Sequence, residues 1–176
     1  MLSGDEILRS DIVRLAQDGE TRAAHVQPNG IDLSLNGVWR FAAAGALGRT
    51  GAERVLPPRE AVVCGPDGWF ELEAGSYGVG YVEWVALPPE CGGLCFPRSS
   101  LLRMGVHVPT AVWDAGYAGR GEGLLEVTNP LGVRLQHRAR VVQLVVFRLS
   151  QAAQSGYAGA YQHENRTPPL EAPTEQ

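Results

Sequence analysis

The sequence predicts a mostly β protein, a compact barrel or sandwich with one short helix near its N-terminus. Short segments rich in aliphatic and aromatic residues recur along the chain, 22 Gly and 12 Pro punctuate them, and helical spacing occurs only near the start. A length of 176 residues with 44% apolar and 19% charged residues fits one globular domain. We expect that domain over residues 1–163.

The first element is expected to be a helix over residues 4–18. Ser3 and Glu6 have the spacing of a capping box, in which each side chain bonds to the other's backbone N–H. Leu8, Ile12 and Leu15 then recur at intervals of four and three, which places them on one helical face.

The rest of the domain is expected to consist of short strands. Residues 42–70 show no clear period, so we expect a long loop there with at most one hairpin. The final residues 164–176 hold three prolines and one large aliphatic residue, and we expect a flexible tail. The predicted strands are IDLSL (31–35), GVWRF (37–41), GVGYVEWVAL (78–87), MGVHV (104–108), GLLEVTN (123–129) and RVVQLVVFRLS (140–150).

The charge composition excludes several classes of function. All 15 basic residues are arginine, so neither a Walker A loop nor a Schiff-base lysine is available. A net charge of -4 without a basic run predicts no nucleic-acid partner. Acids at positions 5, 6 and 11 interrupt the place of a signal peptide, and no apolar run is long enough to cross a bilayer, so we expect a cytoplasmic protein without a membrane partner.

The three cysteines predict reduced thiols. Cys64, Cys91 and Cys95 are odd in number and irregular in spacing, which does not fit a disulfide framework. Cys91 and Cys95 lack the second ligand pair of a structural zinc site, so we expect them to be buried or half-buried structural residues.

The segment FPRSSLLRMGV (96–106) is a candidate anion site. Arg98, Ser99 and Ser100 precede an apolar pair that begins a short helix, and a guanidinium, two hydroxyls and free backbone N–H groups together suit phosphate oxygens. The alternative from spacing alone is that Ser99 is an N-cap and Arg98 a surface charge.

The segment TAVWDAGYAGRGEG (110–123) is a candidate catalytic hairpin. Asp114 lies at its bend and Tyr117 begins the return strand, so the carboxylate is placed to act as a general base for water. The alternative is that Asp-x-Gly is only ordinary turn chemistry.

In this order, these segments resemble the trimeric dUTP diphosphatase and dCTP deaminase superfamily, most closely its archaeal-type dUTP diphosphatase branch. The resemblance covers most of the chain. It rests on QPNGIDLSL (27–35), PRSSLLRMGV (97–106), TAVWDAGYAGRGEGLL (110–125), GVRLQHRARVVQLVVF (132–147) and SGYAGAYQHEN (155–165).

The resemblance implies a jelly-roll-like β-barrel, a homotrimer with sites between subunits, and Mg2+-dependent hydrolysis of dUTP to dUMP and pyrophosphate. It implies that Asp114 activates the attacking water and that Tyr117 packs on the deoxyribose and excludes a 2'-hydroxyl. The remaining implied roles are uracil binding by the backbone of Thr110, Ala111 and Val112, phosphate binding by Arg98, Ser99, Ser100 and Gln143, closure by Tyr161 and Gln162, and a Mg2+ contact through water by Asp32.

Two other functions stay open on the sequence. Glu126 resembles the glutamate with which dCTP deaminases shuttle protons, so the alternative is a dCTP deaminase or a bifunctional deaminase and dUTP diphosphatase. Glu126 lies 12 positions after Asp114, which is the spacing of the hydrolases; the corresponding spacing in the deaminases is two residues shorter. Two residues along a strand displace a side chain by about 7 Å, so the spacing argues against the deaminase role of Glu126. The third hypothesis, a non-catalytic nucleotide-binding protein, is disfavoured by the presence of Asp114 and Tyr117.

Overall fold

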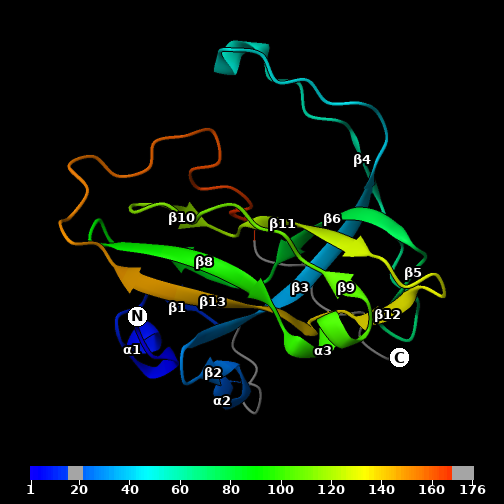
Figure 1. Cartoon of the computed structure of the whole chain (residues 1–176), viewed down its shortest axis with the longest axis horizontal. Helices are drawn as coiled ribbons and strands as arrows, with labels where there is room; N and C mark the ends of the chain where they lie inside the picture. The colour runs from blue at the N-terminus through cyan, green and yellow to red at the C-terminus, as the bar shows by residue number, and fades with distance from the viewer. Residues whose placement is uncertain (16–21, 168–176) are drawn as a thin grey trace.

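The fold is an all-β barrel with short helices at its edges, as the sequence predicts (Figure 1). The computed structural model describes residues 1–15 and 22–167. Its largest sheet has eight strands and curls into a nearly closed barrel. The main path runs through β8 (Cys91–Pro97), β13 (Arg140–Arg148), β3 (Gly30–Phe41), β6 (Gly75–Tyr81), β11 (Glu122–Val127) and β9 (Val106–His107); β2 (Val26–Gln27) and β4 (Arg59–Ala61) also pair with β3.

Two smaller sheets and the helices complete the described part of the chain. One sheet joins β1 (Val13–Arg14), β7 (Trp84–Ala86) and β10 (Ala118–Gly119), and the other joins β5 (Trp69–Leu72) to β12 (Val133–Gln136). The helices are α1 (Gly4–Arg9), α2 (Arg22–His25), α3 (Ser99–Arg103) and the 3-10 turn η1 (Gly51–Glu53).

The core fills the inside of the barrel. Ile31, Leu33, Leu125 and Leu144 on three of the central strands have no exposed surface. At about 25 cal/mol per Å² of apolar surface removed from water, such burial is the dominant stabilising contribution. The first half of β3 is buried on both faces; β2 pairs along its edge, and α1 and α2 also contact this strand.

Strand β3 unites two predicted strands into one. The sequence predicts separate strands over 31–35 and 37–41, whereas β3 runs without a break from Gly30 to Phe41. The pairing with β6 shifts by one residue between Leu35 and Gly37, which marks a β-bulge there. The first half therefore pairs with β13 and the second with β4, while β6 follows the middle.

The predicted N-terminal helix over 4–18 is wrong in length. The Ser3 hydroxyl accepts the N–H of Glu6 at 3.3 Å, as a cap should, but the helix ends at Arg9. Asp11 then takes a positive φ of 53°, and Val13 pairs with Val85 of β7. Strand pairing buries Ile12 and Val13 together and overrides the helical spacing; residues 16–18 lie outside the described part.

The strand predictions differ from the structure mainly where glycine or a bend intervenes. Those over 104–108, 123–129 and 140–150 are confirmed in position by β9, β11 and β13. The segment 78–87 divides into β6 and β7, and β8 was not predicted. Gly92 and Gly93 lower its strand propensity, yet β8 pairs with seven consecutive residues of β13.

Residues 42–58 of the predicted loop over 42–70 form an arm that projects from the barrel (Figure 1), whereas β4 and the start of β5 form strands within the rest of that range. Ala46 and Val55 pair across it through two backbone hydrogen bonds of 2.9 and 2.8 Å, and η1 lies near its tip. Leu47, Val55 and Leu56 are exposed on it. No helix among residues 1–15 and 22–167 is both long and apolar enough to cross a membrane.

Candidate nucleotide site

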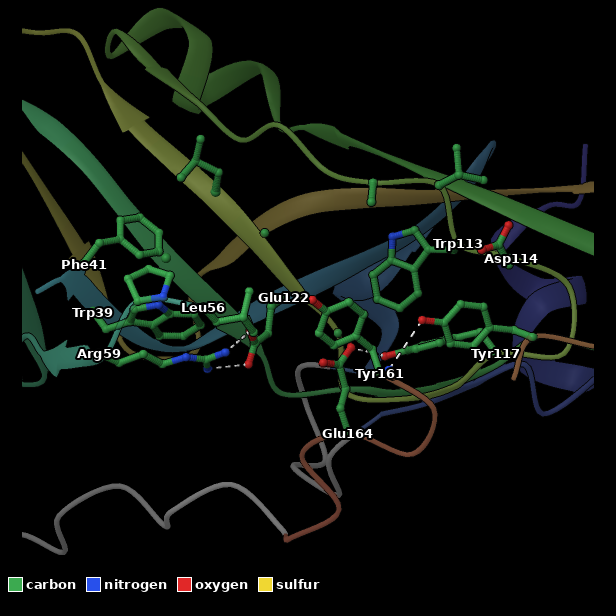
Figure 2. A pocket seen from close by; sticks show the side chains of 18 residues that line it. Trp39, Phe41, Leu56, Arg59, Trp113, Asp114, Tyr117, Glu122, Tyr161 and Glu164 are labelled. Atoms are coloured by element: carbon green, nitrogen blue, oxygen red, sulfur yellow. Dashed lines mark hydrogen bonds and ion pairs between the residues drawn. The ribbon is translucent and has the colours of Figure 1, made fainter. Parts of the chain in front are cut away.

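A pocket of about 520 Å³ opens at the side of the barrel where β11 passes the arm and the C-terminal residues (Figure 2). Its walls are mainly aromatic and aliphatic, with three carboxylates and one arginine among them. This composition suits an uncharged, partly flat group better than a cluster of phosphates. The lining residues are Trp39, Phe41, Leu56, Pro57, Arg59, Gly78, Ala111, Val112, Trp113, Asp114, Tyr117, Gly121, Glu122, Gly123, Leu124, Tyr157, Tyr161 and Glu164.

Asp114 lies in a tight turn at the rim of this pocket. The N–H of Tyr117 bonds to the carbonyl of Asp114 at 3.1 Å, and Gly116 takes a φ of +82° that favours glycine. The predicted turn is therefore confirmed, and the carboxylate is exposed to solvent. A group in this position has access to a water molecule from the pocket side.

The predicted hairpin around this turn is wrong, because its two arms pair with different strands. Trp113 pairs with Gly93 of β8, whereas Ala118 and Gly119 pair with β7. The two arms diverge because each satisfies its backbone groups in another sheet. The divergence leaves the space that the pocket and the C-terminal residues occupy.

Tyr117 is buried beneath the pocket rim. Its ring packs edge-on against Trp113 at 5.2 Å and against Tyr157 at 5.9 Å between ring centroids. Its hydroxyl donates to Oε1 of Glu164 at 2.8 Å. Burial first, and then the facing Glu164 carboxylate, raise the pKa of the Tyr117 hydroxyl, so it stays protonated and remains a donor.

The C-terminal segment, residues 153–166, folds back over the Asp114 turn. Tyr157 N–H bonds to the Ala115 carbonyl at 2.8 Å, and His163 N–H bonds to the Ala118 carbonyl at 2.7 Å. Residues 164–167 of the predicted tail are described and Glu164 is half-buried; residues 168–176 lie outside the described part. This segment covers one side of the pocket.

The two closing residues that the sequence predicts have different surroundings. Tyr161 lines the pocket, and the Arg54 guanidinium of the arm lies 5.4 Å from its ring centroid. Gln162 is absent from the described lining. Its amide oxygen accepts the Ala118 N–H at 2.9 Å and its amide nitrogen donates to the Gly116 carbonyl at 2.8 Å, so it clamps the backbone after the turn.

The opposite wall comes from residues that the sequence does not single out. Arg59 on β4 makes a paired ion bridge to Glu122 on β11 with distances of 2.7 and 2.8 Å, and its guanidinium lies 4.4 Å from the Trp39 ring centroid (Figure 2). Asn165 of the C-terminal segment donates to the same Glu122 at 3.0 Å. Strand β4 at the base of the arm and the C-terminal segment therefore both contact the carboxylate of Glu122 on β11.

The predicted phosphate and metal residues form a second, cationic cluster. Asp32 on β3 is 1% exposed, and its Oδ2 lies 3.0 Å from Nε of Arg98 and 3.1 Å from Nη1 of Arg140. Gln143 on β13 stands opposite Asp32 in the sheet. Burial raises the pKa of Asp32, and the two arginines act against that rise.

Ser99 and Ser100 follow this cluster at the start of α3. Arg98, rather than Ser99, occupies the N-cap position, and both serines are exposed. Their hydroxyls are thus open to a ligand beside Arg98. With Arg140, these residues bring two guanidinium groups and two hydroxyls to the cluster around Asp32.

The single chain does not bring its two predicted half-sites together. Trp113 pairs with Gly93, and Arg98 follows five positions later along β8, which is roughly 17 Å at the rise of an extended strand. The pairing is antiparallel, so Asp114 lies still further from Arg98. Thr110 lies between the halves, where its hydroxyl donates to the Cys95 carbonyl at 3.3 Å.

Glu83 and His25 are buried beside the cationic cluster. The carboxylate of Glu83 accepts the Ser34 N–H at 2.7 Å and lies 3.7 Å from Nδ1 of His25. Burial raises the pKa of Glu83 to about 7. Nδ1 of His25 lies 2.7 Å from the Asp32 carbonyl, so this pair supports the strand that carries Asp32.

No group of three potential metal-ligating side chains gathers anywhere in residues 1–15 and 22–167. Cys91 and Cys95, expected to be structural, are both buried in β8, and burial raises the pKa of each thiol.

Glu126 lies on β11 opposite Ser76 and His107, two residues beyond Leu124, and is not among the described lining of the pocket.

The chain is similar to a family model and to several curated proteins. Residues 1–149 match the family model described as dCTP deaminase-like. The chain is 42% identical over 150 residues to a probable deoxyuridine 5'-triphosphate nucleotidohydrolase of Methanosarcina mazei, covering 85% of this chain and 86% of that protein. A protein of the same name from Aeropyrum pernix is 42% identical over 163 residues, covering 93% and 98% of the two chains.

A solved structure shares the fold. The 2'-deoxycytidine 5'-triphosphate deaminase of Agrobacterium tumefaciens superposes with a TM-score of 0.61 at 21% identity, over 85% of this chain. The present chain spans about half, 47%, of that deaminase chain. The family match covers all strands of the main barrel sheet, and the chain belongs to the dCTP deaminase-like family.

Proposed function

We propose that this protein is a dUTP diphosphatase that hydrolyses dUTP to dUMP and pyrophosphate. The observation that carries the proposal is the pocket, which places Asp114 and Tyr117 on one largely apolar cavity. The relatives named as probable deoxyuridine triphosphate nucleotidohydrolases, 42% identical to this chain, support the same substrate.

The nucleoside occupies the pocket in this proposal. The backbone of Thr110, Ala111 and Val112 binds the uracil edge, and Tyr117 packs against the deoxyribose. The three pocket carboxylates disfavour a triphosphate there, because like charges brought together in a partly buried site repel. The phosphates are therefore assigned to the cluster of Arg98, Ser99, Ser100 and Gln143.

Asp114 acts as the general base. It orients a water molecule and takes its proton as the water oxygen attacks the α-phosphorus, and the bond to the bridging oxygen breaks to release pyrophosphate. A carboxylate needs only hydrogen-bond reach for this role. Its exposure at the pocket rim leaves room for that water.

The complete site forms between copies of the chain, in a homotrimer. The separation of roughly 17 Å along β8 between the position of Trp113 and Arg98 exceeds the combined reach of their neighbouring side chains within one chain. A second copy that presents its Arg98 cluster to the Asp114 rim supplies the missing half. Cyclic symmetry then makes every site equivalent.

The residues present would hold Mg2+ together with the substrate phosphates rather than in a protein cage. Asp32 is a single carboxylate that is already paired with two arginines, so the protein would offer the ion at most one carboxylate, and water and phosphate oxygens would be its main ligands. Asp32 would hold such an ion through water. The ion would supply charge neutralisation at the phosphates, which the chain cannot supply with lysine.

The proposed setting is the cytoplasm. Cys64, Cys91 and Cys95 are free thiols, and thiols of this kind are kept reduced there.

The test incubates the purified protein and Mg2+ with dUTP or with dCTP, and follows pyrophosphate and ammonia in the same samples. We expect pyrophosphate from dUTP and no ammonia from dCTP. Ammonia from dCTP would instead give Glu126 a catalytic role and contradict a pure hydrolase. Absence of both products, with nucleotide still bound, would favour a binding protein.

A further inference from the structure

The ring of Tyr117 is held from several sides by groups of its own chain. Trp113 and Tyr157 pack against it edge-on, at 5.2 and 5.9 Å between centroids. Gly119 passes so close behind the hydroxyl that a Cβ there would lie 2.6 Å from it. Glu164 accepts the hydroxyl hydrogen at 2.8 Å, so a charged acceptor faces the tip of the ring (Figure 2).

Glu164 is itself fixed by the backbone around it. Its carbonyl accepts the Arg120 N–H at 3.2 Å, and the preceding His163 N–H bonds to the Ala118 carbonyl at 2.7 Å. The following Asn165 donates its side-chain amide to the Arg120 carbonyl at 2.8 Å. The Glu164 side chain thus extends from a segment that is anchored on both sides of it.

The hydrogen bond to Glu164 restrains movements of the Tyr117 ring that the aromatic contacts restrain only weakly. Edge-to-face ring packing has a preferred geometry but contributes only about 0.5 to 1.5 kcal/mol beyond burial, whereas a hydrogen bond from a phenol to a carboxylate is strong and short. A pocket that merely fits the smaller ligand rejects one additional hydroxyl only about 100-fold, so rejection depends on how rigid the wall is. The contact with Glu164 supplies rigidity at the wall assigned to the sugar.

We infer that Glu164 is a positioning residue for Tyr117, through which the C-terminal segment of each chain sets the discrimination of its own pocket against ribonucleotides. The inference rests on the proposed function for the choice of nucleotide. Glu164 touches Tyr117 rather than the reacting atoms, so it acts on selectivity more than on the chemical step.

The experiment measures kcat/KM for dUTP and for UTP in wild type, Glu164→Ala, Glu164→Gln, Tyr117→Phe and the double variant Glu164→Ala with Tyr117→Phe. We expect Glu164→Ala to lower the dUTP-to-UTP ratio about tenfold, as loss of a hydrogen bond to a charged group does. Glu164→Gln retains an oxygen acceptor and should restore most of the ratio. In the Tyr117→Phe background, Glu164→Ala should have no further effect on the ratio.

The matched control is Asn165→Gly, which loosens the same segment without touching the Tyr117 hydroxyl. Glycine tolerates the positive φ of 50° at this position. Because Asn165→Gly leaves the Glu164 carboxylate in place, its effect on the ratio and its coupling to Tyr117→Phe should both be smaller than those of Glu164→Ala. The inference would be overturned if Asn165→Gly coupled to Tyr117→Phe as strongly as Glu164→Ala does in the dUTP-to-UTP ratio. Any loosening of the C-terminal segment would then be enough to change the selectivity.

A binding measurement distinguishes failure of the inference from failure of the proposed function. Calorimetry gives the ratio of the dissociation constants for the non-hydrolysable α,β-imido analogues of dUTP and UTP. Turnover of dUTP with an unchanged ratio in Glu164→Ala overturns only the role of Glu164. Failure to bind either analogue overturns both proposals, whereas selective binding without turnover contradicts only the hydrolase.

Discussion

At the residue scale, Asp114 is distinguished by what it does not contact. It is exposed at the pocket rim, whereas Asp32 is buried between two arginines and Glu122 is paired with Arg59. Arginine guanidinium groups already occupy oxygens of Asp32 and Glu122, so these carboxylates are less free to hydrogen-bond an attacking water molecule. Of these three acids, Asp114 is therefore the one suited to act as the base.

Replacing this base should separate binding from turnover. We expect Asp114→Asn to lower kcat on dUTP by roughly 100-fold or more, because a general base typically contributes a factor of that size. The amide keeps the shape of the turn, so the dissociation constant for the α,β-imido analogue of dUTP should change less than about threefold. Lost binding with normal turnover of bound substrate would refute the assignment of Asp114.

Glu83 should make stability depend on pH in the neutral range. Its pKa is raised from 4.5 to about 7 by burial, so the folded state favours the protonated carboxyl. The stabilisation is complete below the unfolded pKa near 4.5 and is lost as pH rises through 7. Between pH 5 and 8, wild type should lose roughly 2 to 3 kcal/mol more of its unfolding free energy than Glu83→Gln.

Urea unfolding at a series of pH values measures this difference. The comparison with Glu83→Gln isolates the carboxyl, because glutamine retains an oxygen that accepts the Ser34 N–H. Parallel pH profiles for the two proteins would show that Glu83 does not titrate between its two states.

At the element scale, the Asp114 turn and the C-terminal segment depend on each other. Gly116 takes a φ of +82°, and a Cβ there would lie 2.6 Å from the Cα of Gly156. The close approach lets Tyr157 and Gln162 bond to the turn backbone. Two glycines that are distant in sequence thus allow the C-terminal segment to pack against the turn next to Tyr117.

Gly116→Ala should displace the C-terminal segment. The positive φ alone costs an alanine about 1 to 2 kcal/mol, and the clash with Gly156 adds to it. We expect a lower melting temperature and faster protease cleavage within residues 153–166. The control Gly51→Ala, on the arm with nothing within 4 Å of its Cβ, should stay within about 0.5 kcal/mol of wild type. Unchanged cleavage in Gly116→Ala would show that the segment does not rest on this contact.

At the scale of the whole molecule, the pocket beside β11 and the cationic cluster lie on different parts of the barrel. β8 joins them, with Gly93 opposite Trp113 near one end and Arg98 following its other end. A rigid strand holds them apart in the same chain. The proposed catalysis uses both halves, so the proposal predicts a second copy of the chain at each site.

Two inactive variants should restore activity when mixed. Asp114→Asn and Arg98→Gln each disable one half-site, so subunits unfolded together and refolded at equal concentration should form some sites with both halves intact. Random assembly in a cyclic trimer gives about a quarter of the wild-type activity. Light scattering measures the oligomer, and absence of recovered activity in a confirmed mixed trimer would place both halves in one chain.

The sequence alone determined the features that depend on neighbouring residues and on motif order. The cap at Ser3, the turn at Asp114, the strands β11 and β13 and the family all follow from local patterns. The interactions that form turns and helix caps involve only a few neighbouring residues, so they can be predicted without knowledge of the fold. The predicted roles of the site residues come from the resemblance and stay predictions.

Only the tertiary structure decided which of these parts meet. It shortened the N-terminal helix in favour of pairing with β7, formed β8 despite its glycines, and brought Arg59, Glu122 and Glu164 to the pocket from three distant segments. Such choices depend on burial and on cross-strand hydrogen bonds between residues far apart in sequence, which no local pattern encodes. For the same reason Glu164 shows no signal in the sequence, although in the folded chain it accepts the hydrogen bond of Tyr117.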